Sequence, residues 1–285
     1  MVSRGRRPGI SLRDLRDAVG NEVAKVVVGH DDALDAMLAA FAVGGHVLLE
    51  GPPGVAKTLL ANAVARALGV EFRRAQFTPD MLPSDLTGTP TLQGGELVFR
   101  PGPVFTNVLL ADEINRTPPK TQAALLEAMQ ERQVSVDGEP QPLPDPFLVV
   151  ATQNPIEYEG TYPLPEAQLD RFLLKLEVGY PEADDEIAML NLTHRGVDPV
   201  TLHDVAAVSD ARALRDIRGE VDGTDVAPEV IGYVSAIVRR TRDLPSVSLG
   251  ASPRAAVHLL AAAKAAARLA GRRFVSPDDV VTMAP

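Results

Sequence analysis

The chain carries the sequence Gly51-Pro52-Pro53-Gly54-Val55-Ala56-Lys57-Thr58 between an apolar run, residues 46–50, and a segment of helical periodicity, residues 58–68. A glycine-containing turn between a strand and a helix can surround a phosphate with backbone N–H groups, and the helix N-terminus adds positive potential. The Lys57 ammonium would neutralise the β- and γ-phosphates, and the Thr58 hydroxyl would bind Mg²⁺. The pattern therefore predicts a nucleotide-binding loop.

The loop departs from the general G-x-x-x-x-G-K-[ST] pattern at Ala56, which replaces the second glycine. An alanine is tolerated there if its backbone φ is negative. The alternative interpretation is an ordinary strand-to-helix turn that contains a lysine by chance. Leu59, which directly follows the motif, is also predicted to belong to the nucleotide-binding residues.

A second apolar run, residues 108–111, ends in two consecutive acids, Asp112 and Glu113. At the carboxyl end of a strand the chain leaves the pleat, so both side chains can approach a ligand. Asp112 is predicted to hold Mg²⁺ through water, and Glu113 to polarise the attacking water as general base. Alternatively, the pair could be solvated acids at the end of a strand.

Three further residues complete the candidate catalytic set. Asn154 follows the apolar run 147–152, and its amide could bond both the attacking water and a γ-phosphate oxygen; Asn before Pro is also a common turn former. Arg254 is predicted in the first turn of a helix, where a cation opposes the macrodipole unless an anion such as the γ-phosphate lies nearby. Arg171 could serve as an arginine finger for the next subunit's ATP, or form a surface ion pair with Asp170.

The pattern of apolar runs predicts an α/β core followed by a helical region. Helical segments separate several of the runs, which favours a parallel sheet of the five runs 46–50, 70–77, 108–111, 147–152 and 172–178. After Tyr180 only helical periodicity is found, and we expect a second domain formed as a helical bundle, with helices at 184–192, 204–217, 228–241, 253–270 and 277–283.

Local signals define helix starts and two hairpins. Ser252-Pro253 and Ser276-Pro277 each place an N-cap residue before a proline suited to the first helical position. Residues 92–97 predict a hairpin turning at Gly94-Gly95, and residues 133–146 a second one turning at Asp137-Gly138.

Composition limits the possible partners and location. The net charge of −10 repels phosphate backbones, and the cluster Arg239, Arg240 and Arg242 is interpreted as a solvated helix end. Nucleic acid is therefore an improbable partner. Zero cysteines, no apolar run of eighteen residues and no secretion signal favour a cytoplasmic protein without membrane insertion.

Taken together, these motifs resemble those of AAA+ ATPases, and more narrowly of the MoxR family. The resemblance runs from Val26-Val27-Val28-Gly29 to the C-terminal helices and includes the loop 51–58 and the strings 76–85, 111–116 and 164–172. It implies a P-loop NTPase fold: a five-stranded parallel sheet core with a C-terminal all-helical lid. The expected division is an N-terminal segment and first helix at 1–25, the ATPase core with a helix-2 insert and a pre-sensor hairpin at 26–182, and the lid at 183–285.

The resemblance also implies roles for individual residues and partners. It implies that Asn154 and Arg254 act as sensors, the residues that contact the γ-phosphate region. It implies that Arg171 acts on the ATP of the next subunit, with Arg116 as a second candidate for a contact across the interface. It also places Val28 and Gly29 near adenine. Related proteins act as chaperone-like ATPases on partner complexes that often contain von Willebrand factor A domains. The chain also ends earlier than expected for the family, which suggests a missing final helical segment.

Three functions compete at this point. The leading one is a hexameric homo-oligomer that binds ATP and Mg²⁺ between core and lid. A neighbour's arginine completes the site, and hydrolysis moves the lid and the hairpins against a protein client. A nucleic-acid motor similar to the MCM helicases would need a basic hairpin, whereas Gln93-Gly94-Gly95-Glu96 is neutral to acidic. A nucleotide-regulated assembly component without turnover is disfavoured by Glu113 and Asn154, which hydrolysis requires and binding does not.

Overall fold

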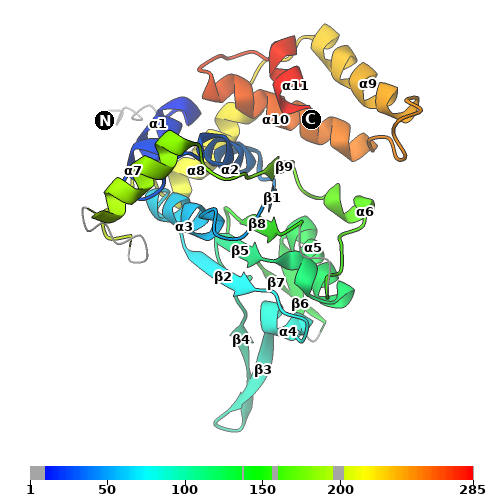
Figure 1. The fold of residues 1–285 in the computed structure, drawn as a ribbon. Helices are drawn as coiled ribbons and strands as arrows, with labels where there is room; N and C mark the ends of the chain where they lie inside the picture. The colour runs from blue at the N-terminus through cyan, green and yellow to red at the C-terminus, as the bar shows by residue number, and fades with distance from the viewer. Residues whose placement is uncertain (1–9, 137, 156–159, 195–201, 285) are drawn as a thin grey trace, which may run out of the picture.

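The computed structural model describes residues 10–136, 138–155, 160–194 and 202–284. Its centre is a single parallel sheet in the order β2-β5-β8-β1-β9, which confirms the predicted α/β core (Figure 1). The strands are β1 Val47–Glu50, β2 Phe72–Gln76, β5 Val108–Asp112, β8 Leu148–Gln153 and β9 Leu174–Glu177.

Each central strand sends alternate side chains into two separate apolar clusters. In β5, for example, Val108 and Leu110 lie in one cluster, and Leu109 and Ala111 lie in the other. Burial on both faces explains why these strands read as continuous apolar runs, as is usual for parallel sheets. The first cluster is covered by α1 Leu12–Val23, α2 Asp31–Val43, α3 Lys57–Ala67 and α8 Ala211–Asp222; α4 Pro83–Thr87 and α5 Pro119–Glu131 contribute to the second.

Both predicted hairpins are present. Strands β3 Gly88–Gln93 and β4 Glu96–Pro101 pair antiparallel around Gly94 and Gly95, whose φ values of 60° and 93° are the kind that glycine adopts readily. This hairpin projects from the body of the molecule (Figure 1). Strands β6 Gln133–Val136 and β7 Glu139–Pro142 form the second hairpin, although Asp137, part of its predicted turn, lies outside the described residues.

The C-terminal helices do not form one separate bundle. Helices α9 Pro228–Arg242, α10 Pro253–Leu269 and α11 Pro277–Met283 enclose a small apolar cluster of their own. Helix α8, in contrast, buries Leu214, Ile217 and Val221 in the large cluster of the core, beyond the boundary predicted at residue 182. Helix α7 spans Ala183–His194, and the short helices η1 and α6 span Ile114–Arg116 and Glu166–Leu169.

The helix predicted at 204–217 begins seven residues later than expected, at Ala211. The residues before it are bonded to α3, since Arg66 donates to the Val205 carbonyl and the Val208 N–H donates to Ala67. Asp210 then caps the helix by accepting from the backbone of Arg212 and Ala213. Tertiary contact with α3 therefore overrides the helical periodicity of this segment. The predicted N-caps Ser252 and Ser276 are confirmed.

A buried histidine at the start of β1 makes stability depend on pH. His46 contacts Phe147 edge to face, bonds the Met129 carbonyl at 3.1 Å and accepts from the Val149 N–H at 3.0 Å. Burial lowers the pKa of His46 to about 4, although the bond to Met129 opposes the shift. The ring is therefore neutral in the folded protein under conditions where an exposed histidine, with a pKa of about 6.5, begins to take up a proton.

We expect this histidine to destabilise the folded state as the pH falls. Above about pH 6.5 both states hold the neutral ring; below it, only the unfolded state binds the proton, so roughly 2 kcal/mol of unfolding free energy is lost by pH 5. His46→Gln removes the titration, and urea unfolding at pH 7.5 and 5 measures the difference. His30 and His258, whose pKa values are also lowered, affect both proteins alike. An equal pH dependence in the two proteins would contradict the prediction.

Within the described residues, no helix has the length and apolar character needed to cross a bilayer.

Candidate functional site

The predicted loop, acids and Asn154 come together at the carboxyl ends of β1, β5 and β8. Because β5, β8 and β1 are neighbours in the sheet, the segments that leave them meet at one edge. A pocket of about 190 Å³ opens there. Its lining comprises Pro53, Gly54, Val55, Ala56, Lys57, Thr58, Asp112, Glu113, Thr152, Gln153 and Asn154.

The loop is held against the end of β9. A Cβ added at Gly51 would lie 2.1 Å from the Val178 carbonyl oxygen, so only glycine fits at the start of the turn. Lys57 folds back over the loop and donates to the carbonyls of Gly51 at 2.6 Å and Pro52 at 2.9 Å. Partial burial lowers the pKa of the Lys57 ammonium, and the charges of Asp112 and Glu113 oppose that shift.

Ala56 corrects one expectation about the loop. Its φ is 58°, in the left-handed region, whereas an alanine was considered tolerable there only at negative φ. This conformation costs an L-residue about 1–2 kcal/mol because Cβ approaches the following carbonyl oxygen. Helix α3 begins at the next residue, and Lys57 and Thr58 of its first turn line the pocket. The sequence pattern alone could not give the sign of φ.

Asp112 is the centre of a hydrogen-bond network. Its Oδ1 accepts from the Thr152 hydroxyl at 2.6 Å, and its Oδ2 lies 3.4 Å from the Thr58 hydroxyl. Arg74 of β2 also donates to Oδ2, from Nε at 3.0 Å and from Nη2 at 2.7 Å. A hydroxyl and a carboxylate this close beside a phosphate loop fit Mg²⁺, which takes few protein ligands and keeps waters.

Glu113 leaves β5 in a strained conformation, with φ at 58°. Its N–H donates to the Thr152 hydroxyl at 2.9 Å, so one threonine fixes both acids. The Glu113 carboxylate accepts from Gln76 at 2.7 Å and lies 3.4 Å from the Arg116 guanidinium. A residue held at positive φ next to a pocket is typical of a functional position.

Two buried amides support this turn from behind. Gln122 of α5 donates to the carbonyl of Ile114 at 3.1 Å and to that of Tyr162 at 2.8 Å. Asn115 donates to the backbone carbonyl of Asn154 at 3.4 Å, which ties the turn after β5 to the end of β8. The side chain of Asn154 is itself buried. Asn154, the residue predicted to orient the attacking water, is therefore buried at a point where its backbone is bonded to the turn after β5.

Sequence reasoning missed four polar residues around the acids. Arg74, Gln76 and Thr152 bond Asp112 or Glu113 directly, and Gln122 bonds the turn that follows them. Arg74 and Gln76 lie on β2, whose register places Gln76 opposite Asp112. The available signal was the presence of two polar residues at alternate positions of the strand predicted at residues 70–77. Without the strand order, nothing in the sequence connects them to the acids.

Arg171 and Arg254 lie outside the lining of this pocket, and so does Arg116, although it is 3.4 Å from the Glu113 carboxylate that belongs to the lining. Arg171 follows α6 and donates to Gln130 at 3.2 Å, while Asp170, its proposed ion-pair partner, instead accepts from Ser252. Arg254 is exposed in the first turn of α10, and Arg116 is 40% exposed on η1. Among the described residues, the pocket lining includes none of the three.

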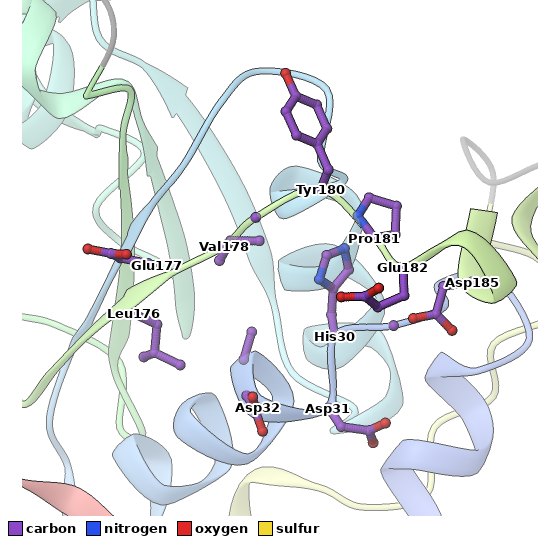
Figure 2. Close-up of a pocket in the computed structure, with 13 residues that line it drawn as sticks. His30, Asp31, Asp32, Leu176, Glu177, Val178, Tyr180, Pro181, Glu182 and Asp185 are labelled. Carbon is purple, nitrogen blue, oxygen red and sulfur yellow. The ribbon is translucent and has the colours of Figure 1, made fainter. Parts of the chain in front are cut away.

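A second pocket, of about 360 Å³, contains one of the two residues predicted near adenine (Figure 2). Gly29, at φ 78°, lines it, and a Cβ there would lie 2.4 Å from the Asp185 carboxylate. Figure 2 shows His30, Glu182 and Asp185 on the same side of this pocket, away from Glu177. Burial lowers the pKa of His30, against the opposing charge of Asp185. Val28 precedes this lining and does not belong to it.

Comparisons with known proteins agree with this geometry. Residues 46–174 match the model of the ATPase family associated with various cellular activities (AAA), and residues 239–285 match that of the AAA lid domain. The chain is 49% identical to the uncharacterized protein YeaC of Bacillus subtilis, covering 95% of this chain and 86% of that one. It is 46% identical to chaperone MoxR1 of Mycobacterium tuberculosis, covering 93% and 72%.

Two further similarities extend over nearly the whole chain. Protein MoxR of Methylorubrum extorquens is 36% identical, over 98% of this chain and 89% of that protein. A solved crystal structure from Cytophaga hutchinsonii superposes with a TM-score of 0.87 at 40% identity, over 96% of this chain and 85% of that one.

Proposed function

Because this chain belongs to the MoxR family of AAA+ ATPases, we propose that it hydrolyses ATP with Mg²⁺ at sites completed by neighbouring subunits of a hexameric ring. The energy would drive a chaperone-like remodelling of a partner protein complex. One observation carries the proposal: the Thr58 hydroxyl and the Asp112 carboxylate lie 3.4 Å apart beside Lys57, at the mouth of a phosphate loop.

The chain's own residues divide the chemistry between them. Backbone N–H groups of residues 51–59 would surround the β-phosphate, and Lys57 would exchange its carbonyl partners in the loop for the β- and γ-phosphates. Bound Mg²⁺ would supply charge neutralisation at the phosphates, held by Thr58 and, through water, by Asp112. Glu113 would accept a proton from the attacking water, which Asn154 orients.

An arginine from the next subunit would complete the site. A phosphoryl transition state needs positive charge beyond that of the loop lysine, and an arginine finger commonly supplies it. Arg171 is our first candidate and Arg116 the second, since both lie outside the lining of their own chain's pocket. Arg254 would contact the γ-phosphate from the lid. This division of roles predicts that an isolated subunit turns ATP over poorly.

The acidic pocket beside Gly29 indicates which end of the bound nucleotide lies near it. Asp31, Asp32, Glu177, Glu182 and Asp185 give its lining a negative character that repels phosphates. We therefore place the adenine near Val28 and Gly29 and the triphosphate at Lys57.

A protein client is favoured over a nucleic acid. The tip of the β3–β4 hairpin exposes Leu92 and Leu97, and the turn between them has no basic residue. Apolar side chains on a projecting hairpin suit contact with protein, whereas a nucleic-acid motor would need lysine or arginine there. A client that contains a von Willebrand factor A domain stays a prediction from the family resemblance.

Calorimetry and light scattering test the proposal together. We expect Lys57→Ala to weaken ATP binding in the presence of Mg²⁺ by roughly 10- to 100-fold, the value of hydrogen bonds to a charged group. Lys120→Ala, at an exposed position of α5, is the matched control and should bind as the unaltered chain does. Light scattering with ATP and Mg²⁺ should give six subunits. Equal affinities of Lys57→Ala and the control would contradict the loop assignment, and a monomer under all nucleotide conditions would contradict the ring.

A further inference from the structure

A hydrogen-bond bridge joins the start of α10 to the segment that carries Arg171. The Ser252 hydroxyl lies 2.7 Å from Oδ1 and 2.9 Å from Oδ2 of Asp170, across 82 positions of sequence. The same Ser252 oxygen accepts from the Ala255 N–H at 3.0 Å as the N-cap of α10. One hydroxyl therefore fixes the helix end and binds a carboxylate on the core.

The bridge lies next to both arginines that the proposed function uses. Asp170 precedes Arg171 in the chain, and Ser252 lies two residues before Arg254. The segment around Asp170 is a rigid turn, because the N–H groups of Asp170, Arg171 and Phe172 donate to the carbonyls of Glu166, Gln168 and Leu169. A displacement of Asp170 would therefore displace Arg171 with it.

A polar contact joins the lid to the core segment at the start of α10, whereas farther along the helix Ala265 packs in the apolar cluster of the core. A pocket of about 270 Å³ lies between α10 and the core segment, lined by Asp170, Phe172, Ala255 and His258 among others. His258, six residues beyond Ser252, lines the same pocket, where burial lowers its pKa and the charge of Asp170 opposes that shift. At this end of α10, the hydrogen bonds between Ser252 and Asp170 tie the helix to the core segment.

We propose that the Ser252–Asp170 bridge positions Arg171 for the neighbouring subunit's ATP and thereby links the lid of one subunit to hydrolysis in the next. Ser252 and Asp170 are positioning residues in this scheme, and the inference rests on the proposed function. When Arg254 and the start of α10 move with the nucleotide of their own subunit, the bridge transmits the movement to the turn that carries Arg171. Neighbouring sites are thus coupled through two side chains.

The test separates the bridge from the helix cap. Ser252→Asp keeps an N-cap acceptor for the Ala255 N–H but cannot donate to Asp170 and repels it. We expect a roughly tenfold lower kcat, because Arg171 would be displaced from the reacting phosphate, and an unchanged KM for ATP. The double variant Ser252→Asp with Asp170→Asn restores a donor and an acceptor in reversed positions, and should recover kcat to within about threefold of the unaltered chain.

Mixed rings then test whether the effect passes between subunits. Glu113→Gln subunits are inactive but keep an intact Arg171, so mixing them with Ser252→Asp subunits should raise turnover per active site. A kcat of Ser252→Asp equal to that of the unaltered chain, a double variant that stays impaired, or no recovery on mixing would each overturn the inference. If Arg171→Ala keeps full turnover, the proposed role of Arg171 in the neighbouring site is wrong. If Arg171→Ala loses turnover but Ser252→Asp keeps it, only the role of the bridge is wrong.

Discussion

Glu113→Gln is expected to lower ATP turnover by roughly 10²- to 10⁴-fold, the usual contribution of a general base, and to leave ATP affinity near that of the unaltered chain. The amide has the size of the carboxylate and can still accept a hydrogen bond from Gln76, but it cannot take a proton from water. The backbone of the turn is held independently by Thr152 and Gln122, so the substitution leaves the pocket in place.

The matched control for this variant is Glu127→Gln, the same change at an exposed position of α5. Turnover from steady-state phosphate release and affinity from calorimetry should both match the unaltered chain in the control. If Glu113→Gln hydrolysed ATP at the normal rate, the base assignment would be wrong. If it lost affinity instead, Glu113 would belong to nucleotide binding and not to the chemical step.

Arg171→Ala is expected to reduce turnover by roughly 10³-fold or more, as arginine fingers supply charge to the transition state. The loss should be reversible in a mixed ring. Glu113→Gln subunits cannot hydrolyse ATP but present an intact Arg171 to their neighbours, so mixing two nearly inactive proteins should restore part of the activity. If Arg171 acted within its own subunit, mixing with other subunits could not restore the lost activity.

Two arginine variants complete the experiment. Arg239→Ala, at an exposed position near the end of α9, should retain full turnover and controls for the loss of one positive charge. Arg116→Ala decides between the candidates, because the finger is the arginine whose loss is rescued by mixing. Rescue of Arg116→Ala together with failure of Arg171→Ala to be rescued would reverse our assignment.

Much of the fold and the centre of the site could be predicted from the sequence because local signals and periodicity agreed. The five apolar runs became the five strands, and the acids at 112 and 113 lie at a strand end beside the loop. A parallel sheet brings the carboxyl ends of its strands to one edge. The order of motifs along the chain was therefore sufficient to place Lys57, Thr58 and Asp112 together.

The parts that could not be predicted depend on tertiary contacts. Arg74 meets Asp112 only because β2 pairs with β5 in a particular register. The first turns expected for α8 are instead bonded to the end of α3. Ala56 adopts a positive φ because the loop has to turn into α3, against its residue preference. Arg74 and the start of α8 depend on partners that are distant in sequence, so no local pattern records them, whereas at Ala56 the local sequence does not give the sign of φ.

The alanines of α10 have a consequence for how the lid can move. Ala263 and Ala267 are buried in the lid's own cluster, while Ala265 is buried in the large cluster of the core against which α10 packs. A single helix is thus shared by both bodies, and it contributes to the core cluster the methyl group of Ala265 and the partly buried Leu269. Such a smooth surface offers few interlocking side chains, so one body can slide on the other without repacking, as in a shear mechanism. Small translations along α10, rather than a wide hinge opening, are the motion this contact favours.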